Sequence, residues 1–334
     1  MQFNVARQPL IPAFLSLVIL LILALCNTAG ELVAPNLYAG ISPEELPLPA
    51  WGGKLEAFRA AHSGWAHTLA AFCLLFSALS IGRMTARFKL YGISTFIAMP
   101  LFMLCMLGVV PNPSWFSLII TATLLTLAVK NCCYSFRNGF SFDATFRAGL
   151  YLALTLLVMP KAAPLALMLP IALVQFRRTT REKIVAFCGF MLPMLTWCYL
   201  NWALGGSFTA PTRLFYALLR EGSWFSEILA STLYEQIFCA TLLVLDLLAV
   251  FLFVANSYTL STRSRHTLLF ASHLLLLGVS SALVPNATLS VLALLTIPSA
   301  LMLPVLFIRI RGGLAQILYP VVVAAAVVSL LLFS

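Results

Sequence analysis

Hydrophobic residues in this chain fall into long runs of Leu, Ile, Val and Phe, separated by short polar segments with clustered charges. An apolar run of about 17 to 25 residues is long enough for a helix to cross the hydrocarbon core of a bilayer. The pattern therefore predicts an all-α, polytopic transmembrane helical bundle. The clear spans are predicted near residues 9–27, 65–82, 90–110, 114–130, 183–204, 235–256, 267–283, 288–308 and 314–333.

A further apolar stretch, at 144–176, is cut by the sequence Met159-Pro160-Lys161-Ala162-Ala163-Pro164. We interpret it as a broken helix pair, in which two short helices meet at the outer membrane face. The predicted total is then about eleven transmembrane helices. They would form a single integral membrane domain over residues 1–334.

The composition supports this fold class, because 62% of the residues are hydrophobic and only 9% are charged. The mean hydropathy is +1.01, a value outside the range of ordinary water-soluble domains. Strands of a membrane barrel would alternate polar and apolar residues over roughly 10 positions, and the long apolar runs lack that alternation. Helices are therefore favoured over a barrel.

Most of the 20 lysines and arginines lie in segments that the predicted spans place on one side of the membrane. By the positive-inside rule that side is the cytoplasm, so we predict a bacterial inner-membrane protein with a cytoplasmic N-terminus and a periplasmic C-terminus. The net charge of +10 is then a topology signal and does not indicate a nucleic-acid partner. The residues assigned to the cytoplasmic side are Arg7, Arg83, Arg87, Lys89, Lys130, Arg137, Arg147, Arg177, Arg178, Arg181, Lys183, Arg263, Arg265, Arg309 and Arg311.

Residues 1–27 also resemble a secretory signal, with Arg7 ahead of an apolar core. Cleavage after Ala29 is the alternative to retention as the first span. Retention is preferred, because the apolar run is long and Asn27-Thr28-Ala29 does not match the small residues that a cleavage site requires.

Two outer segments, residues 28–64 and 205–234, are long enough to carry a function. We expect interfacial helices in both, because certain residues recur there at three- to four-residue spacing. Such helices would roof a cavity that is open to lipid and suited to a long amphiphilic substrate. The alternative is a pair of loops that rest on the membrane. The recurring positions are Leu55, Phe58, His62, Trp65, Phe215, Leu218, Leu219, Trp224, Phe225, Ile228 and Leu229.

The segment from Asp143 to Phe208 resembles two families of membrane proteins. Its features, in chain order, are a short helix with Gly149, a break at Pro160-Lys161, a basic turn at Arg177-Arg178, and Asn201 followed by Gly206-Ser207. This order resembles the middle of the C-type membrane glycosyltransferases, which take a sugar from a polyprenyl-phosphate carrier at the outer membrane face. The segment is more closely similar, through Phe142-Asp143 and Arg181-Glu182, to an uncharacterised family of bacterial integral membrane proteins with no assigned activity.

The glycosyltransferase resemblance implies an activity on a lipid-linked sugar or a similar envelope precursor at the outer face. It also implies an acidic catalytic residue soon after the first span, where this chain has Glu31 and, further along, the pair Glu44-Glu45. The loop departs from the family pattern because it contains no aspartate. An inactive relative of the scaffold is therefore an alternative.

A phosphate-binding role is predicted for Lys161, which lies between two proline-broken half-helices, together with Arg213 and Arg220 of the second outer loop. The expected partner is membrane lipid, including a polyprenyl-phosphate-linked substrate. The alternative for Lys161 is an interfacial lysine whose ammonium group extends toward the headgroups.

Asp246 lies near the centre of the predicted span 235–256, where a charged side chain costs at least ~2.5 to 3.5 kcal/mol. We therefore expect it to be neutral, paired or exposed to water. His273 in the next span is a candidate partner. The pair favours a second hypothesis, a proton-coupled transporter or flippase, although a structural hydrogen bond explains Asp246 equally well.

Other chemistry finds little support in the sequence. The eight cysteines form no C-x-x-C pair and no Cys/His spacing suited to zinc, so neither a metal nor a cofactor is expected. Every predicted inner loop is short, which argues against a cytoplasmic nucleotide enzyme. A third hypothesis is a non-catalytic membrane subunit of an envelope assembly or secretion complex.

Overall fold

The structure is a computed structural model, and it describes residues 9–27, 51–109, 114–134, 141–220, 233–285, 292–310, 315, 318–321 and 323. The regular elements in these residues are helices, and no strand occurs among them. The all-α prediction is therefore confirmed.

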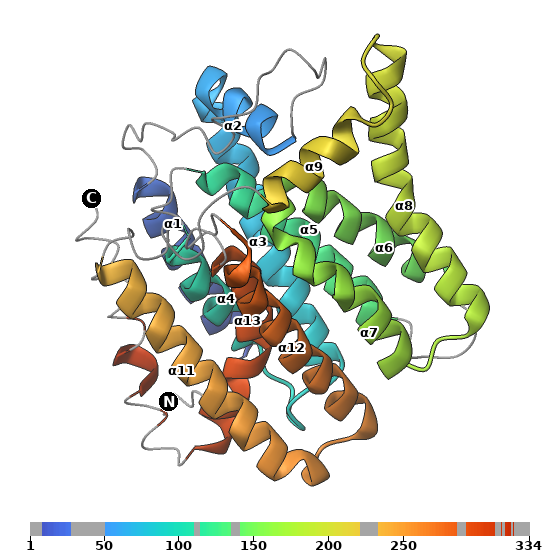
Figure 1. The fold of residues 1–334 in the computed structure, drawn as a ribbon. Helices are drawn as coiled ribbons and strands as arrows, with labels where there is room; N and C mark the ends of the chain where they lie inside the picture. The colour runs from blue at the N-terminus through green and yellow to red at the C-terminus, as the bar shows by residue number, and fades with distance from the viewer. Residues whose placement is uncertain are drawn as a thin grey trace.

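Most of the helices run along a common direction, and α2 and α9 lie near one end of the bundle (Figure 1). In chain order the helices are α1 (Leu10–Asn27), α2 (Trp51–Ala61), α3 (Ser63–Arg87), α4 (Ala98–Leu107), α5 (Trp115–Tyr134), α6 (Phe142–Val158), η3 (Pro160–Leu167), α7 (Met168–Gln175), α8 (Thr180–Ala203), α9 (Ala210–Arg220), α11 (Leu233–Asn256), η4 (Ser257–Thr259), α12 (Thr262–Ser280), η5 (Ser281–Leu283) and α13 (Leu292–Arg309).

Five helices in the described part of the chain are long and apolar enough to cross a membrane. They are α3, α5, α8, α11 with η4, and α12 with η5. Shorter apolar helices occupy Leu10–Leu25, Ala98–Leu107, Pro160–Gln175 and Ala293–Arg309. The structure is thus compatible with a membrane-embedded protein, whereas the total of eleven spans, the inner membrane and the orientation of the termini stay predictions.

The predicted span at 90–110 is wrong in its length, because only Ala98–Leu107 is helical there. Ten residues extend about 15 Å, half of the hydrocarbon thickness. The preceding residues form turns, and Gly92 has a φ of +81°. The hydroxyl of buried Tyr91 donates a hydrogen bond of 3.0 Å to the carbonyl of Leu301, so this apolar segment packs into the protein rather than into lipid.

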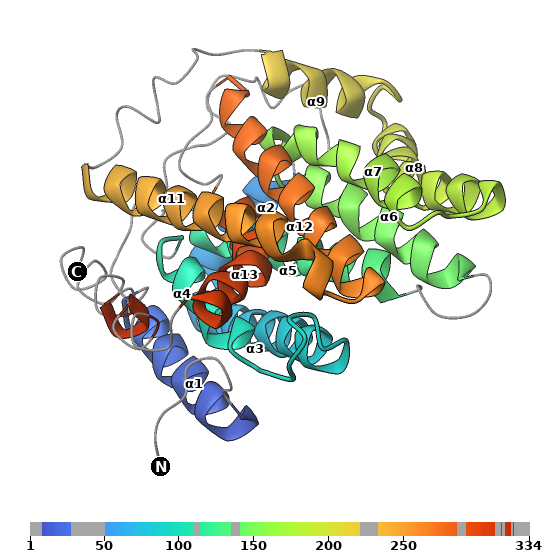
Figure 2. The same ribbon diagram turned by 90° about the horizontal axis from the view of Figure 1, so that it is seen from below.

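α13 forms the centre of one half of the molecule and packs against α4, α5, α11 and α12 (Figure 2). Every residue from 293 to 307 is buried. A helix that is apolar on all sides is stable only when other helices or lipid surround it. α11 differs, because it buries a stripe with Leu242, Ala249 and Phe253 and leaves large apolar side chains exposed on its other face.

The other half of the molecule is built around α6 and α8, which pack on each other at two glycines. A Cβ atom on Gly149 would lie 2.2 Å from the carbonyl oxygen of Ala186. A Cβ atom on Gly189 would lie 2.3 Å from the carbonyl oxygen of Phe146. The two backbones are therefore in direct contact, as in membrane helices that pair through small residues.

In the described residues, each outer segment contains one of the expected short helices, α2 in the first and α9 in the second. α9 packs on α8 and η3, and its Leu214 lies in a small buried cluster with Leu157 and Trp197. Its Arg213 and Tyr216 are exposed, which makes the helix amphipathic. The position of α2 and α9 at the membrane interface stays a prediction. The further helix expected around residues 224–229 lies outside the described residues.

Candidate functional site

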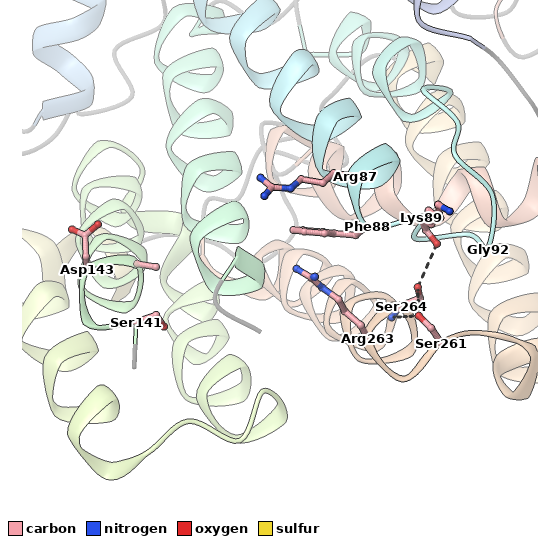
Figure 3. A pocket seen from close by; sticks show the side chains of 10 residues that line it. Arg87, Phe88, Lys89, Gly92, Ser141, Asp143, Ser261, Arg263 and Ser264 are labelled. Atoms are coloured by element: carbon pink, nitrogen blue, oxygen red, sulfur yellow. Dashed lines mark hydrogen bonds between the residues drawn. The ribbon is translucent and has the colours of Figure 1, made fainter. Parts of the chain in front are cut away.

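A cavity of about 720 Å³ lies where α3 ends and where α6 and α12 begin (Figure 3). Its walls therefore come from three parts of the chain that are far apart in sequence. The polar lining consists mainly of cations and hydroxyls, namely Arg87, Lys89, Arg263, Ser141, Ser261 and Ser264. This combination of donors is suited to an anion.

The cavity carries a net positive charge. Arg87 and Lys89 are exposed, and Arg263 is half-buried. Among the described residues that line the cavity, Asp143 is the only acid, and its carboxylate lies 2.9 Å from the guanidinium of Arg147. The three lining cations thus outnumber an acid that already has a cationic partner.

Arg263 is held in place by an aromatic ring. Its guanidinium carbon lies 3.5 Å from the centroid of Phe88, and Arg87 extends on the opposite side of that ring in Figure 3. Stacking uses the flat face of the guanidinium, while the N–H donors lie at its edge. The ring therefore orients Arg263 without neutralising its charge.

Lys89 reaches the cavity from a strained position. The last turn of α3 closes with hydrogen bonds from Lys89 N to Ala86 O (3.2 Å) and from Leu90 N to Thr85 O (3.1 Å), a Schellman motif. Its left-handed residue is usually glycine, but here it is Lys89 with a φ of 45°. Backbone strain of this kind is found preferentially at functional sites.

The start of α12 is fixed by its cap and by the turn after α3. The Ser261 hydroxyl accepts from the Ser264 N–H at 3.3 Å, and the Ser264 hydroxyl donates to the Lys89 carbonyl at 3.5 Å (Figure 3). These contacts hold the end of α3 against the beginning of α12. The first turn of α12 is thereby placed beside the cavity.

The start of α6 is fixed by Glu182 of α8, which is buried. Glu182 accepts hydrogen bonds from the backbone N–H and the hydroxyl of Ser141, at 3.0 and 3.1 Å. It also accepts from Thr179 in a capping box at the beginning of α8. Ser141 and Asp143 therefore line the cavity from a position that α8 determines.

The residues predicted for an outer-face site are only partly described. Glu31, Glu44 and Glu45 lie outside the described residues. Lys161 lies in η3 and is only 8% exposed.

Arg213 and Arg220 are both exposed on α9, which packs on η3. The structure thus brings the elements that carry Lys161 and Arg213 together. They lie beyond the far end of α6, roughly 25 Å from Ser141 along a helix of 17 residues.

Asp246 is fully buried on the inner face of α11. The hydroxyl of Ser299 on α13 donates a hydrogen bond to its Oδ2 at 2.5 Å, and its Oδ1 has no hydrogen-bond partner among the residues that the structure describes. His273 is not that partner: its Nδ1 lies 2.7 Å from the carbonyl oxygen of Leu269 in its own helix. The structural hydrogen bond is therefore present, and it comes from a serine that the sequence did not single out.

The fold and the cavity define the class of protein: an all-helical chain with several membrane-capable helices and a basic cavity at one end of its bundle. No protein-family model matches the chain, and no curated protein or solved structure matches it either. The function is therefore argued from the site.

In the sequence, the positive-inside rule accounts for Arg87, Lys89 and Arg263 by topology alone. The available signal was their position, since each follows or precedes a long apolar run at the same predicted membrane side. What the sequence did not reveal is that the end of α3 packs against the beginning of α12, which turns separate charges into one lining.

Proposed function

We propose that this protein binds a phosphate-bearing amphiphile at the membrane and holds its phosphate in the cavity between α3, α6 and α12. The lining of that cavity carries the proposal: three cations line a volume of about 720 Å³, and Asp143 is the only acid among the described lining residues. Arginine, lysine and serine together provide the charge-assisted and hydroxyl hydrogen bonds that phosphate oxygens accept.

The beginning of α12 supports an anion as the ligand. α12 begins at Thr262, and Ser261, Arg263 and Ser264 line the cavity. The first N–H groups of a helix have no acceptor within it, and the macrodipole places partial positive charge there. A phosphate at this position is favoured over a neutral or cationic ligand. The beginning of α6 adds nothing to this, because the Glu182 carboxylate already accepts from the Ser141 N–H there.

The location favours an amphiphile over a soluble phosphate compound. α3 and α12 are both long enough to cross a membrane, so their ends belong near the headgroup layer. On the turns that lead to the cavity, α3 exposes Phe72, Phe76 and Leu79. Acyl or polyprenyl chains would contact this apolar surface while the phosphate enters the cavity.

Binding of phosphatidylglycerol to the purified full chain, measured by native mass spectrometry in a neutral detergent, tests the proposal. Lys89→Gln and Arg263→Gln each remove one lining charge, and each should weaken binding about tenfold. Arg265→Gln is the matched control, because Arg265 is an exposed residue of the same helix that does not line the cavity. Its affinity should stay within about twofold of the wild type.

Equal losses in the three variants would overturn the proposal, because affinity would then follow total charge rather than the cavity. Inorganic phosphate provides the second arm of the experiment. If inorganic phosphate displaces phosphatidylglycerol at a concentration similar to that of the lipid, the cavity binds soluble phosphates. The proposal of an amphiphilic ligand would then be overturned. Should loss of the Arg263 stack unfold the protein, the exposed Lys89→Gln change still decides the result.

Asp246 favours a second candidate function, proton-linked movement of such an amphiphile across the membrane. Its supporting observation is a carboxyl group with 0% exposure, in a helix that can cross the membrane, with one oxygen that has no partner in the described part of the chain. Transfer of fluorescent phosphatidylglycerol between leaflets of proteoliposomes, with and without a pH gradient, tests it. Asp246→Asn should remove the effect of the gradient and leave lipid binding unchanged; an unaltered gradient effect contradicts this function.

A further inference from the structure

A second cavity, of about 250 Å³, adjoins the first and shares Arg87 and Phe88 with it. Its remaining lining comes from the last turns of α3 and from α5, namely Ser80, Arg83, Met84 and Lys130. Arg87 and Phe88 therefore form a wall between the two cavities. A ligand group on either side of this wall would be within reach of Arg87.

The second cavity is also basic. Arg83 and Arg87 are exposed and lie one turn apart on the same face of α3, and Lys130 lines the cavity from α5. Like charges at this spacing repel each other on a helix. The Lys130 ammonium lies 5.6 Å from the ring centroid of Phe76, and no acidic residue lines the cavity in the described part of the chain. Guanidinium and ammonium groups lining one cavity are suited to hold an anion there.

We propose that the two cavities together bind one lipid headgroup with two phosphate groups, one phosphate in each cavity. The inference rests on the proposed function and adds the number of phosphates and their separation. Each phosphate has its own cations, Lys89 and Arg263 on one side and Arg83 and Lys130 on the other, and Arg87 lines both sites. Basic pockets between transmembrane helices bind headgroups of this kind, such as that of cardiolipin.

The wall decides between two arrangements of the phosphates. In a diphosphate the two phosphorus atoms share one oxygen, so the whole group fits within the larger cavity. Two cavities separated by the side chains of Arg87 and Phe88 are instead suited to two phosphodiesters joined by a short linker. Once one phosphate is bound, the linker keeps the second at high local concentration beside its own cations, which raises the affinity for the pair.

Competition between cardiolipin and phosphatidylglycerol at equal total phosphate, on the purified full chain and read by native mass spectrometry, tests the inference. The wild type should prefer cardiolipin by at least about tenfold. The double variant Arg83→Gln/Lys130→Gln should lose most of this preference while its affinity for phosphatidylglycerol changes less than about twofold. Arg181→Gln/Lys183→Gln removes the same charge from exposed residues that line neither cavity, and it should keep the preference.

The outcomes separate this inference from the proposed function. Equal binding of the two lipids, or a preference that survives Arg83→Gln/Lys130→Gln, overturns the two-phosphate inference. The proposed function still stands in that case if Lys89→Gln weakens phosphatidylglycerol. If Lys89→Gln leaves both lipids unaffected, the proposed function fails and the inference fails with it.

Discussion

Arg178 Nη1 lies 3.4 Å from Glu182 Oε1, and both side chains are almost fully buried where α5, α6 and α8 meet. Arg178 also donates a hydrogen bond to the carbonyl of Cys132 at the end of α5. Glu182 accepts from the backbone of Ser141 ahead of α6. This pair therefore connects three helices and determines where one wall of the basic cavity lies.

Glu182→Ala should lower the stability of the protein by about 3 to 5 kcal/mol, because it leaves the guanidinium of Arg178 buried without its carboxylate. The measurement is thermal unfolding in detergent, followed by circular dichroism. Asp143→Ala is the matched control: it breaks another i,i+4 pair, with Arg147, in which the two side chains are 56% and 75% exposed. Exposed pairs contribute less than about 1 kcal/mol, so equal losses in the two variants would contradict a structural role for Glu182.

The contact between α6 and α8 makes a second stability prediction. In Gly149→Ala the new methyl group would overlap the backbone oxygen of Ala186, which cannot move unless the helices separate. We expect a loss of about 1 to 3 kcal/mol, as for other overpacked sites. Gly64→Ala, where no described residue comes within 4 Å of the added atom, should be neutral or stabilising by up to about 1 kcal/mol. Thermal unfolding in detergent measures both changes in stability, the loss in Gly149→Ala and the absence of a loss in Gly64→Ala. A Gly149→Ala variant as stable as the wild type would mean that the two helices are not in backbone contact.

Ser299→Ala should destabilise the α11–α13 contact, because it removes the donor to a fully buried carboxyl group. A buried polar group without a partner costs about 1 to 3 kcal/mol. Thr296→Val is the control on the same helix, since among the described residues the Thr296 hydroxyl bonds only to the carbonyl of Ala293 in the preceding turn. Its effect on the unfolding temperature should be much smaller, and comparable effects in both variants would show that Asp246 does not depend on Ser299.

The helical class could be predicted from sequence because apolar runs without alternation admit few structures in a bilayer. The length of the span at 90–110 could not. Leu90 and Tyr91 are apolar enough for lipid, yet both are buried inside the protein. Hydropathy does not distinguish a lipid environment from a protein interior, because the two are similarly apolar. Only the packing of this segment against α13 separates them.

The basic cavity could not be predicted from the sequence either, for a different reason. Lys89 and Arg263 each lie in a short cluster that the positive-inside rule already explains, so neither required a second function. Their meeting depends on a tertiary contact, from Ser264 to the carbonyl of Lys89. For Asp246 the sequence did identify an unusual residue, but the partner on α13 is an ordinary serine that no local pattern marks.

The left-handed backbone at Lys89 predicts that stability and ligand binding respond in opposite directions to one substitution. Lys89→Gly removes the strain of a φ of 45° and should stabilise the protein by about 1 kcal/mol. The same change removes a cation from the cavity, so binding of phosphatidylglycerol should fall about tenfold.

Arg177→Gly is the matched control for this prediction, because Arg177 follows the C-cap of α7 in the same Schellman geometry. Its φ is 50°, and the hydrogen bonds run from Arg177 N to Val174 O and from Arg178 N to Leu173 O. Arg177 lines neither basic cavity, so Arg177→Gly should give the gain in unfolding temperature with no loss of lipid binding. If Lys89→Gly and Arg177→Gly both bind lipid as tightly as the wild type, Lys89 does not bind the ligand. Ligand binding would then not explain why a lysine occupies this strained position.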